Sequence, residues 1–228
     1  MLDSLLKGVV GPDLYPEEEL KLRANRRGRA YLVKRRVRHH TILNRRRIMQ
    51  HLWKARRSWL EGKGVEAAYR LGWAMHYIQD MCVGGADHEA SEAELRTLPI
   101  PLKLIDKAAA EMKPSPVLLE SVVKRIGPSR GDSAITTASA ASAIAAAAVF
   151  GPLNPPEDLE REVAGKRGQH VLSTVTAVVS VLTGLAAIQL APTVSLLFFA
   201  AAACCYALDG DYRRLRKELK WFVKPDAF

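Results

Sequence analysis

The spacing of hydrophobic and polar positions predicts helices through the first half of the chain. Residues 42–61 carry an apolar stripe with arginines at the remaining positions, as expected of an amphipathic helix. Residues 65–82 place their apolar side chains near core spacing, and the glycine pair that follows ends that helix. Residues 17–36 contain no proline and are rich in Arg, Leu, Lys and Ala, which are good helix formers. We therefore predict three long helices here.

The rest of this half predicts shorter helices. They are expected at 88–97, 101–112 and 116–126, with prolines between them. No stretch alternates apolar and polar residues clearly enough for a strand. The predicted fold class is therefore all-α, with a basic helical head in residues 1–130.

The second half contains a long uncharged stretch. From His170 to Leu208 there is no Asp, Glu, Lys or Arg. This is about twice the length that spans a bilayer as one helix, roughly 20 residues. Pro192 divides the stretch into 171–190 and 193–208, which predicts a C-terminal membrane helical hairpin of two spans. A buried hairpin in a soluble protein is the alternative interpretation.

Residues 133–150 form a third apolar segment, rich in the small residues that let helices approach closely. Basic segments mark the cytoplasmic side of a membrane protein. Both the head and the tail are basic, with six Lys or Arg between 213 and 224, so we expect an even number of spans. Segment 133–150 is then predicted to pack against the two spans or to lie shallow in the membrane, and a third span is the alternative.

These patterns divide the chain into four parts. The predicted parts are a head (1–130), an Ala-rich helix with a connector (131–170), a two-span membrane hairpin (171–208) and a basic cytoplasmic tail (209–228). The predicted location is therefore a membrane, with the head and the tail on the cytoplasmic side.

The charge of the chain indicates which class of binding partner to expect. The 228-residue chain has a net charge of +10, and 15 basic residues but no acidic one lie between Glu19 and Glu61. Such a segment attracts anions, and arginine suits two-point contact with phosphate. The arginines predicted to bind phosphate are Arg38, Arg45, Arg46 and Arg47. Beside a bilayer the simplest partners are anionic phospholipid headgroups. RNA or a ribosome is the alternative, and a solvated helix face is the interpretation without a function.

The candidate chemistry lies in "LGWAMHYIQDMCVGGADHEASE", residues 71–92. His76 and Asp80 are four apart, as are His88 and Glu92, so each pair shares a helix face. Imidazole and carboxylate are suitable zinc ligands. Alternatively, His76 makes an ordinary hydrogen bond in the core, and the glutamates form a solvated acidic face.

The histidine pair His39–His40, the helix "AAYRLGWAMHYIQDM" and the later H-x-x-x-E together resemble the zinc-dependent phospholipase C family, whose fold is shared by fungal single-strand nucleases. The resemblance covers about residues 38–92. It implies that His76 and Asp80 are the central zinc ligands, with Asp80 bridging two ions at the catalytic centre. It also implies that His40 or His39 is the upstream ligand. The implied closing pair is His88 and Glu92.

Two departures from the family reduce the expected metal content. "CVGGAD" has no histidine where the family has one, unless Cys82 or Asp87 substitutes, and the chain starts MLDS rather than with the family's metal-binding tryptophan. We therefore expect one or two zinc ions. The function implied is a membrane-anchored metal-dependent phosphodiesterase that acts on phospholipid headgroups, with a metal-bound water as nucleophile. A descendant without catalytic activity and a non-enzymatic membrane tether for RNA or a ribosome are the alternatives.

Overall fold

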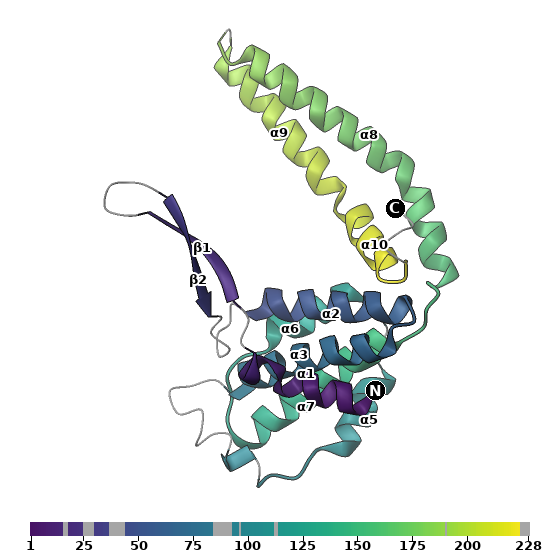
Figure 1. Cartoon of the computed structure of the whole chain (residues 1–228). Helices are drawn as coiled ribbons and strands as arrows, with labels where there is room; N and C mark the ends of the chain where they lie inside the picture. The colour runs from purple at the N-terminus through teal and green to yellow at the C-terminus, as the bar shows by residue number, and fades with distance from the viewer. Residues whose placement is uncertain are drawn as a thin grey trace. The chain divides into compact units, whose positions relative to one another are not determined.

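The computed structural model describes residues 1–15, 18–24, 30–36, 44–83, 93–95, 97–111, 114–189 and 191–223. Contacts divide these residues into two compact units, Met1–Gly151 and Pro152–Val223. Helices are the main elements of both units (Figure 1). The predicted helical class is confirmed at this level.

The first unit is built around one central helix. Its helices are α1 (Leu2–Leu14), α2 (Arg45–Leu60), α3 (Gly64–Val83), α5 (Leu102–Ala110), α6 (Pro116–Arg125) and α7 (Gly131–Phe150). Helix α3 packs against α1, α2 and α7, and α7 also contacts α5, α6 and α2 (Figure 1). The first unit is therefore a helical bundle.

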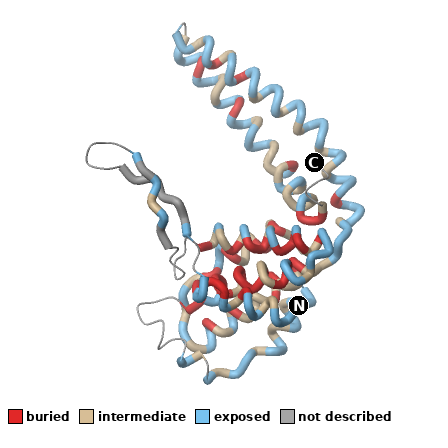
Figure 2. The backbone as a smooth tube through the Cα atoms, viewed as in Figure 1, coloured by how far each residue is buried: buried red, intermediate tan, exposed pale blue. Residues whose placement is uncertain are grey.

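The core of this bundle lies along α2 and α3, which are the predicted helices 42–61 and 65–82. Helix α2 buries Ile48 and Leu52, and α3 buries Leu71 and Ile78 (Figure 2). Gly62 lies between the two helices with φ +76°, a conformation that glycine adopts without strain. Both predictions are confirmed, with ends that differ by one to three residues.

The shorter predicted helices at 101–112 and 116–126 correspond to α5 and α6. Ser115 caps α6: its hydroxyl accepts a hydrogen bond from the Leu118 amide at 3.1 Å, and Pro116 occupies the first turn. Of the predicted helix 88–97, only residues 93–95 are described as helical, and 88–92 lie outside the described residues.

The predicted helix at 17–36 is wrong. The structure has two antiparallel strands there, β1 (Glu18–Ala24) and β2 (Ala30–Arg36), with Leu22 paired to Leu32. The sequence from Leu20 to Arg23 alternates leucine with a basic residue, which suits the two faces of a strand. The local alternation therefore outweighs the high helix propensity of leucine, lysine and arginine.

The Ala-rich helix α7 belongs to the first unit, whereas we expected segment 133–150 beside the membrane spans. It packs against α3 and α5, and its C-terminal end is capped by a buried arginine. Nη1 of Arg56 donates hydrogen bonds of 2.9 Å to the carbonyl oxygens of both Val149 and Gly151. The boundary by contacts therefore falls after Gly151 rather than near Arg130.

The second unit is a helical hairpin followed by a basic helix. Its helices are α8 (Glu157–Ala187), α9 (Pro192–Leu208) and α10 (Gly210–Lys220). Helices α8 and α9 pack along one another, so both predicted spans are helical, and α8 begins well before residue 171. Lys166 of α8 pairs with Asp211 of α10 at 3.2 Å, and His170 pairs with Asp209 at 2.8 Å.

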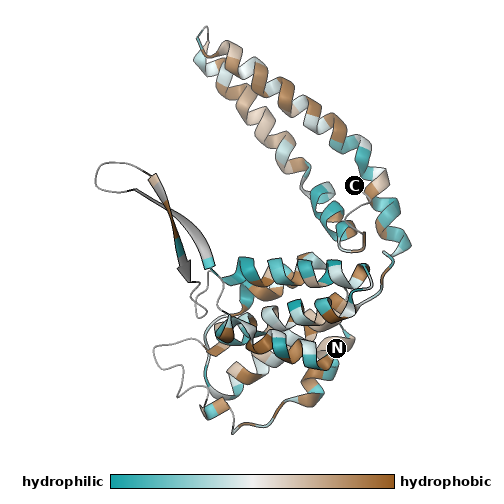
Figure 3. Ribbon diagram, in the orientation of Figure 1, coloured by the Kyte–Doolittle hydropathy of each residue, from teal (hydrophilic) through white to brown (hydrophobic). Residues whose placement is uncertain are grey.

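The hairpin exposes apolar side chains along most of its length (Figures 2 and 3). Three helical segments among the described residues are long and apolar enough to cross a membrane: Gly131–Phe150, Glu157–Ala187 and Pro192–Lys220. Within the protein, 39% of the first window is buried but only 11% and 17% of the others. These helices are consistent with a membrane location, and α8 and α9 have the surface that lipid would cover.

Candidate functional site

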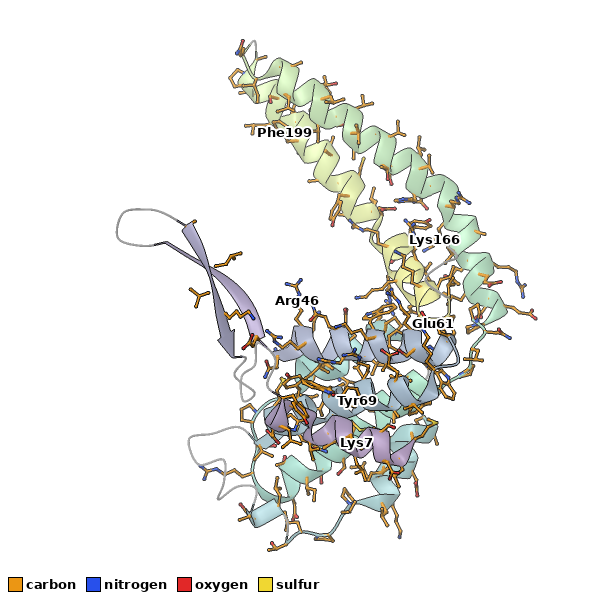
Figure 4. All side chains as sticks on the ribbon, viewed as in Figure 1. Lys7, Arg46, Glu61, Tyr69, Lys166 and Phe199 are labelled. Carbon is orange, nitrogen blue, oxygen red and sulfur yellow. The ribbon has the colours of Figure 1, made fainter. Side chains whose placement is uncertain are left out.

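A close crossing of α1 and α3 forms the candidate site. A Cβ on Gly8 of α1 would overlap the carbonyl oxygen of Tyr69. A Cβ on Gly72 of α3 would overlap the carbonyl oxygen of Leu5. Only glycine lets two backbones approach so closely. The crossing brings the last turns of α1 to the middle of α3, where Tyr69 and Lys7 mark the two helices in Figure 4.

The imidazole of His76 lies between two carboxylates at this crossing. Its Nε2 is 3.1 Å from Oδ2 of Asp80, one turn further along α3, and 3.6 Å from Oδ1 of Asp13 on α1. The side chains of His76 and Asp80 are 10% and 7% exposed, whereas that of Asp13 is 67% exposed. His76 and Asp80 therefore point toward one another, as predicted from their spacing, and Asp13 is a neighbour that the sequence did not indicate.

The surroundings of His76 favour its protonated form. Burial alone would lower the pKa of the imidazole, but the hydrogen bond to Asp80, the charges of Asp80 and Asp13, and the backbone of Val9 together raise it. When His76 is protonated, its charge attracts both carboxylates. A metal ion would have to replace that proton, because only neutral imidazole is a ligand.

The donor atoms of His76 and Asp80 fit a shared metal ion. Two ligands at zinc distances lie roughly 3.3 Å apart at the tetrahedral angle, close to the 3.1 Å found here. Among the described residues, however, no group of three His, Cys, Asp or Glu is placed to hold a metal. The other predicted ligands lie outside the described residues: His39, His40, His88 and Glu92. The zinc site therefore stays a prediction.

Cys82 is poorly suited to substitute as a ligand. It follows Asp80 by two residues and so points to another side of α3. Burial raises the pKa of its thiol to about 12, whereas a metal ligand must be a thiolate. Its carbonyl oxygen accepts a hydrogen bond of 2.8 Å from the Ser129 amide, which fits a structural role.

Aromatic packing holds α2 and α3 together beside the site. The ring of His51 on α2 stacks on Trp73 of α3 with centroids 5.3 Å apart and lies 5.9 Å from the ring of Tyr77. Within α3, Tyr77 meets His76 edge-on at 5.8 Å. His51 is thus a buried core histidine.

The predicted phosphate-binding arginines differ in their surroundings. Nη2 of Arg45 donates to the carbonyl oxygen of Ile126 at 3.0 Å, which ties α2 to the end of α6. Arg46 is exposed (Figure 4), Arg47 is half-buried, and Arg38 lies outside the described residues. Helix α2 also exposes Lys54 and Arg57. The exposed cations of α2 therefore lie one or two turns apart on one face.

Comparisons of the chain with protein-family models, with curated proteins and with solved structures find no match. The resemblance of residues 38–92 to the zinc-dependent phospholipase C family accordingly remains an interpretation of the sequence. The crossing of α1 and α3 with its histidine and two carboxylates is the site on which a function has to be argued.

Proposed function

We propose that this chain is a membrane-anchored, metal-dependent phosphodiesterase with its reactive centre at His76 and Asp80. The observation that carries the proposal is the buried imidazole whose Nε2 faces two carboxylates. Of these groups, His76 Nε2 and Asp80 Oδ2 have the spacing of two ligands on one zinc ion. Bound there, zinc would supply a Lewis acid for a phosphate oxygen and would make water acidic enough to serve as a nucleophile near neutral pH.

The residues of the site have different chemical roles, which follow from how exposed each side chain is. Asp80 is buried, and its Oδ2 lies 3.1 Å from Nε2 of His76, so it orients the imidazole and offers a second ligand atom. Asp13 is largely exposed, so its carboxylate can accept a proton from water at the mouth of the site. His76 contributes a neutral nitrogen once its proton has left.

Attachment to a membrane makes phospholipid headgroups the substrates closest to this centre. The segment joining the two units, residues 152–156, can extend no further than about 20 Å. The cations Arg46, Lys54 and Arg57 on α2 are exposed, and each can contribute about 1 kcal/mol of attraction near an anionic leaflet. The substrate class proposed is therefore a phosphodiester at a lipid–water interface.

Metal content and turnover test this proposal. The full chain would be purified in detergent and analysed for bound metal, and hydrolysis of bis-p-nitrophenyl phosphate would be followed. His76→Ala and Asp80→Ala should each remove most of the zinc and the activity. The double variant should add little, because the two ligands act on one ion. Asp13→Ala should reduce turnover more than zinc content, whereas Asp3→Ala, on the same helix but away from the site, should change neither.

A structural pair would behave differently. The wild-type protein would then contain no zinc, and His76→Ala would only lower the free energy of unfolding by roughly 1 kcal/mol, as expected for one lost hydrogen bond. That result would overturn the hydrolase proposal.

We propose that α8 and α9 are the only spans among the described helices, with both basic ends in the cytoplasm. The capped end of α7 within the first unit supports this count. Single cysteines at the exposed positions Val65 and Arg216, in a chain without its native cysteines, should react with an impermeant thiol reagent from the same side. Labelling from opposite sides would require a third span.

The exposed cations of α2 also support a second candidate, a tether without enzymatic activity that holds RNA. Replacing Arg46, Lys54 and Arg57 by Gln should weaken anionic-surface binding in a salt-dependent way. Binding to vesicles with anionic lipid supports the first proposal. A metal-free protein that binds RNA but not such vesicles supports the tether.

A further inference from the structure

The first unit contains an apolar cavity away from the residues assigned so far. Its volume is about 610 Å³, and it lies between α3, α5 and α7. Helix α3 lines it with Met75, Gln79 and Val83, which recur every four residues along one face. His76 and Asp80 follow on the next positions of the helix and do not line the cavity.

Small side chains on α7 create this space. Ala138, Ser142 and Ala146 also recur every four residues and face the cavity. Their side chains are short, so they leave open a space between α7 and α3 that larger side chains would fill. On the other side α5 covers the cavity loosely. Ile105 lines it, yet none of the residues of α5 is fully buried. The opening between α3, α5 and α7 therefore follows from the choice of residues on α7.

One polar atom inside is unsatisfied. The hydroxyl oxygen of Ser142 is buried, and it has no hydrogen-bond partner within the part of the chain that the structure describes. Buried polar groups in folded proteins are normally paired with protein, water or ligand. Ser142 lines the cavity, so an oxygen atom of a bound molecule would supply the missing partner. A largely apolar cavity with a few polar groups, here Gln79, Ser139 and Ser142, is typical of a ligand site, and its volume lies in the usual range, roughly 300–1,000 Å³.

We propose that this cavity binds one acyl chain of a membrane phospholipid, with the Ser142 hydroxyl donating to an oxygen at the head of that chain. Most of the lining matches a hydrocarbon, because eight of its eleven residues are alanine, isoleucine, leucine, valine or methionine. The short connection between this unit and the proposed membrane spans also favours lipid as the ligand. Residues 152–156 and the first turns of α8, up to the uncharged stretch that starts at His170, limit the distance between this unit and a bilayer to about 40 Å. Phospholipid is therefore present at high effective concentration.

This site does not depend on the proposed metal centre. An acyl chain held between α3 and α7 would fix a phospholipid on the first unit whether or not its phosphodiester is cleaved. Loss of zinc by His76→Ala should therefore leave acyl-chain binding unchanged, so the two proposals can fail separately.

Photolabelling tests the inference. The full chain in nanodiscs would contain a phosphatidylcholine with a photoreactive group midway along one acyl chain, and labelled peptides would be located by mass spectrometry. We expect labels on α3 and α7 around the cavity, as well as on the exposed faces of α8 and α9, which serve as an internal reference. We call the labels on α3 and α7 the head labels and those on α8 and α9 the hairpin labels. Ala146→Phe fills the cavity and should lower the head labels about tenfold relative to the hairpin labels, the equivalent of about 1.4 kcal/mol.

Further variants separate filling from misfolding. Ser139→Leu is a milder filling change and should lower the head labels in the same direction, while Ser142→Ala should lower them through the lost hydroxyl. Thr136→Phe, at an exposed position of the same helix that does not line the cavity, should leave them unchanged. All variants would be checked for native helicity and melting temperature.

Three outcomes would overturn the proposal. One is an absence of label around the cavity in the wild-type chain. Another is head labelling that neither Ala146→Phe nor Ser139→Leu reduces. The third is complete displacement of the head labels by a small amount of free fatty acid, which would assign the cavity to that ligand instead.

Discussion

The guanidinium of Arg56 closes the C-terminal end of α7, and its removal should loosen that end from the first unit. Nη1 donates to the carbonyl oxygens of Val149 and Gly151, both at 2.9 Å. Such carbonyls have no partner within their own helix, and a positive charge is favourable at this end of the helix dipole. Arg56→Met keeps most of the aliphatic side chain and removes every donor.

Two effects of opposite sign set the magnitude. The two carbonyl groups lose their donor in a buried place, at about 1–3 kcal/mol each. Against this, the variant no longer buries a charge. Burial lowers the pKa of Arg56 to about 10, which means that the charged form is disfavoured where it lies, so removing the charge offsets part of this loss. The expected net loss therefore lies near the lower end of the combined range for the two carbonyls, about 2 kcal/mol of unfolding free energy, or a melting temperature lower by about 4–8 °C in a chain of this size.

Thermal unfolding of the full chain in detergent, followed by far-UV circular dichroism, measures this loss. Arg57→Met is the matched control, because Arg57 is the next residue of α2 and is exposed. A surface change of this kind should alter the free energy by less than about 0.5 kcal/mol. Arg56→Lys should lie between the two, since a lysine keeps the charge but cannot present two donors in a planar fork.

Equal melting temperatures for Arg56→Met and Arg57→Met would refute the reasoning. The end of α7 would then not be held by Arg56, and the segment Gly131–Phe150, which is long and apolar enough to span, would become a candidate third span. Amide exchange near Val149 would show the same difference locally.

Three further predictions concern other contacts. The pKa of His76 is raised in the folded protein. Its contribution to stability is therefore complete below the unfolded pKa of about 6.5 and is lost as pH rises through the pKa of the folded state. The melting temperature of the metal-free protein should fall with pH over this range, and His76→Gln should remove that dependence. Gly72→Val should separate α1 from α3 and lower both the melting temperature and zinc uptake, whereas Gly127→Val, where a Cβ meets nothing within 4 Å, should change neither. Ser195→Ala removes the buried 2.7 Å hydrogen bond to the Gly184 carbonyl oxygen and should destabilise the α8–α9 pair by about 0.6 kcal/mol in a bilayer-mimetic denaturation assay.

Helices with a clear apolar stripe could be predicted from the sequence. The stripe of α2 requires only local spacing, and the structure buries Ile48 and Leu52 as that spacing indicates. The strands β1 and β2 were missed because lysine, arginine and leucine have high helix propensity, while the pairing of Leu22 with Leu32 joins two strands across a hairpin. Propensity does not report such pairings.

The candidate site was predictable only where its residues share one helix. His76 and Asp80 are four apart, so a helix is enough to bring them together. Asp13 reaches them only because α1 crosses α3 at Gly8 and Gly72, and no local pattern connects those two glycines. The same limit applies to Arg56. Its position in a basic segment suggested a surface role, whereas its partners lie 93 and 95 residues away, at the end of a helix that the sequence placed against the membrane spans or shallow in the membrane.

The uncharged tip of the α8–α9 hairpin has a consequence for biogenesis under the proposed two-span topology. No Asp, Glu, Lys or Arg occurs from His170 to Leu208, so the segment that would reach the far leaflet carries no charged side chain. Moving a charged side chain into the hydrocarbon costs about 2.5–3.5 kcal/mol per residue on insertion scales. The buried hydrogen bond from Ser195 to Gly184 satisfies one of the polar groups on the way. Such a hairpin can enter as one preassembled unit after the ribosome has released both helices, and no folded domain has to be translocated. The two basic ends would then remain in the compartment where the chain was synthesised.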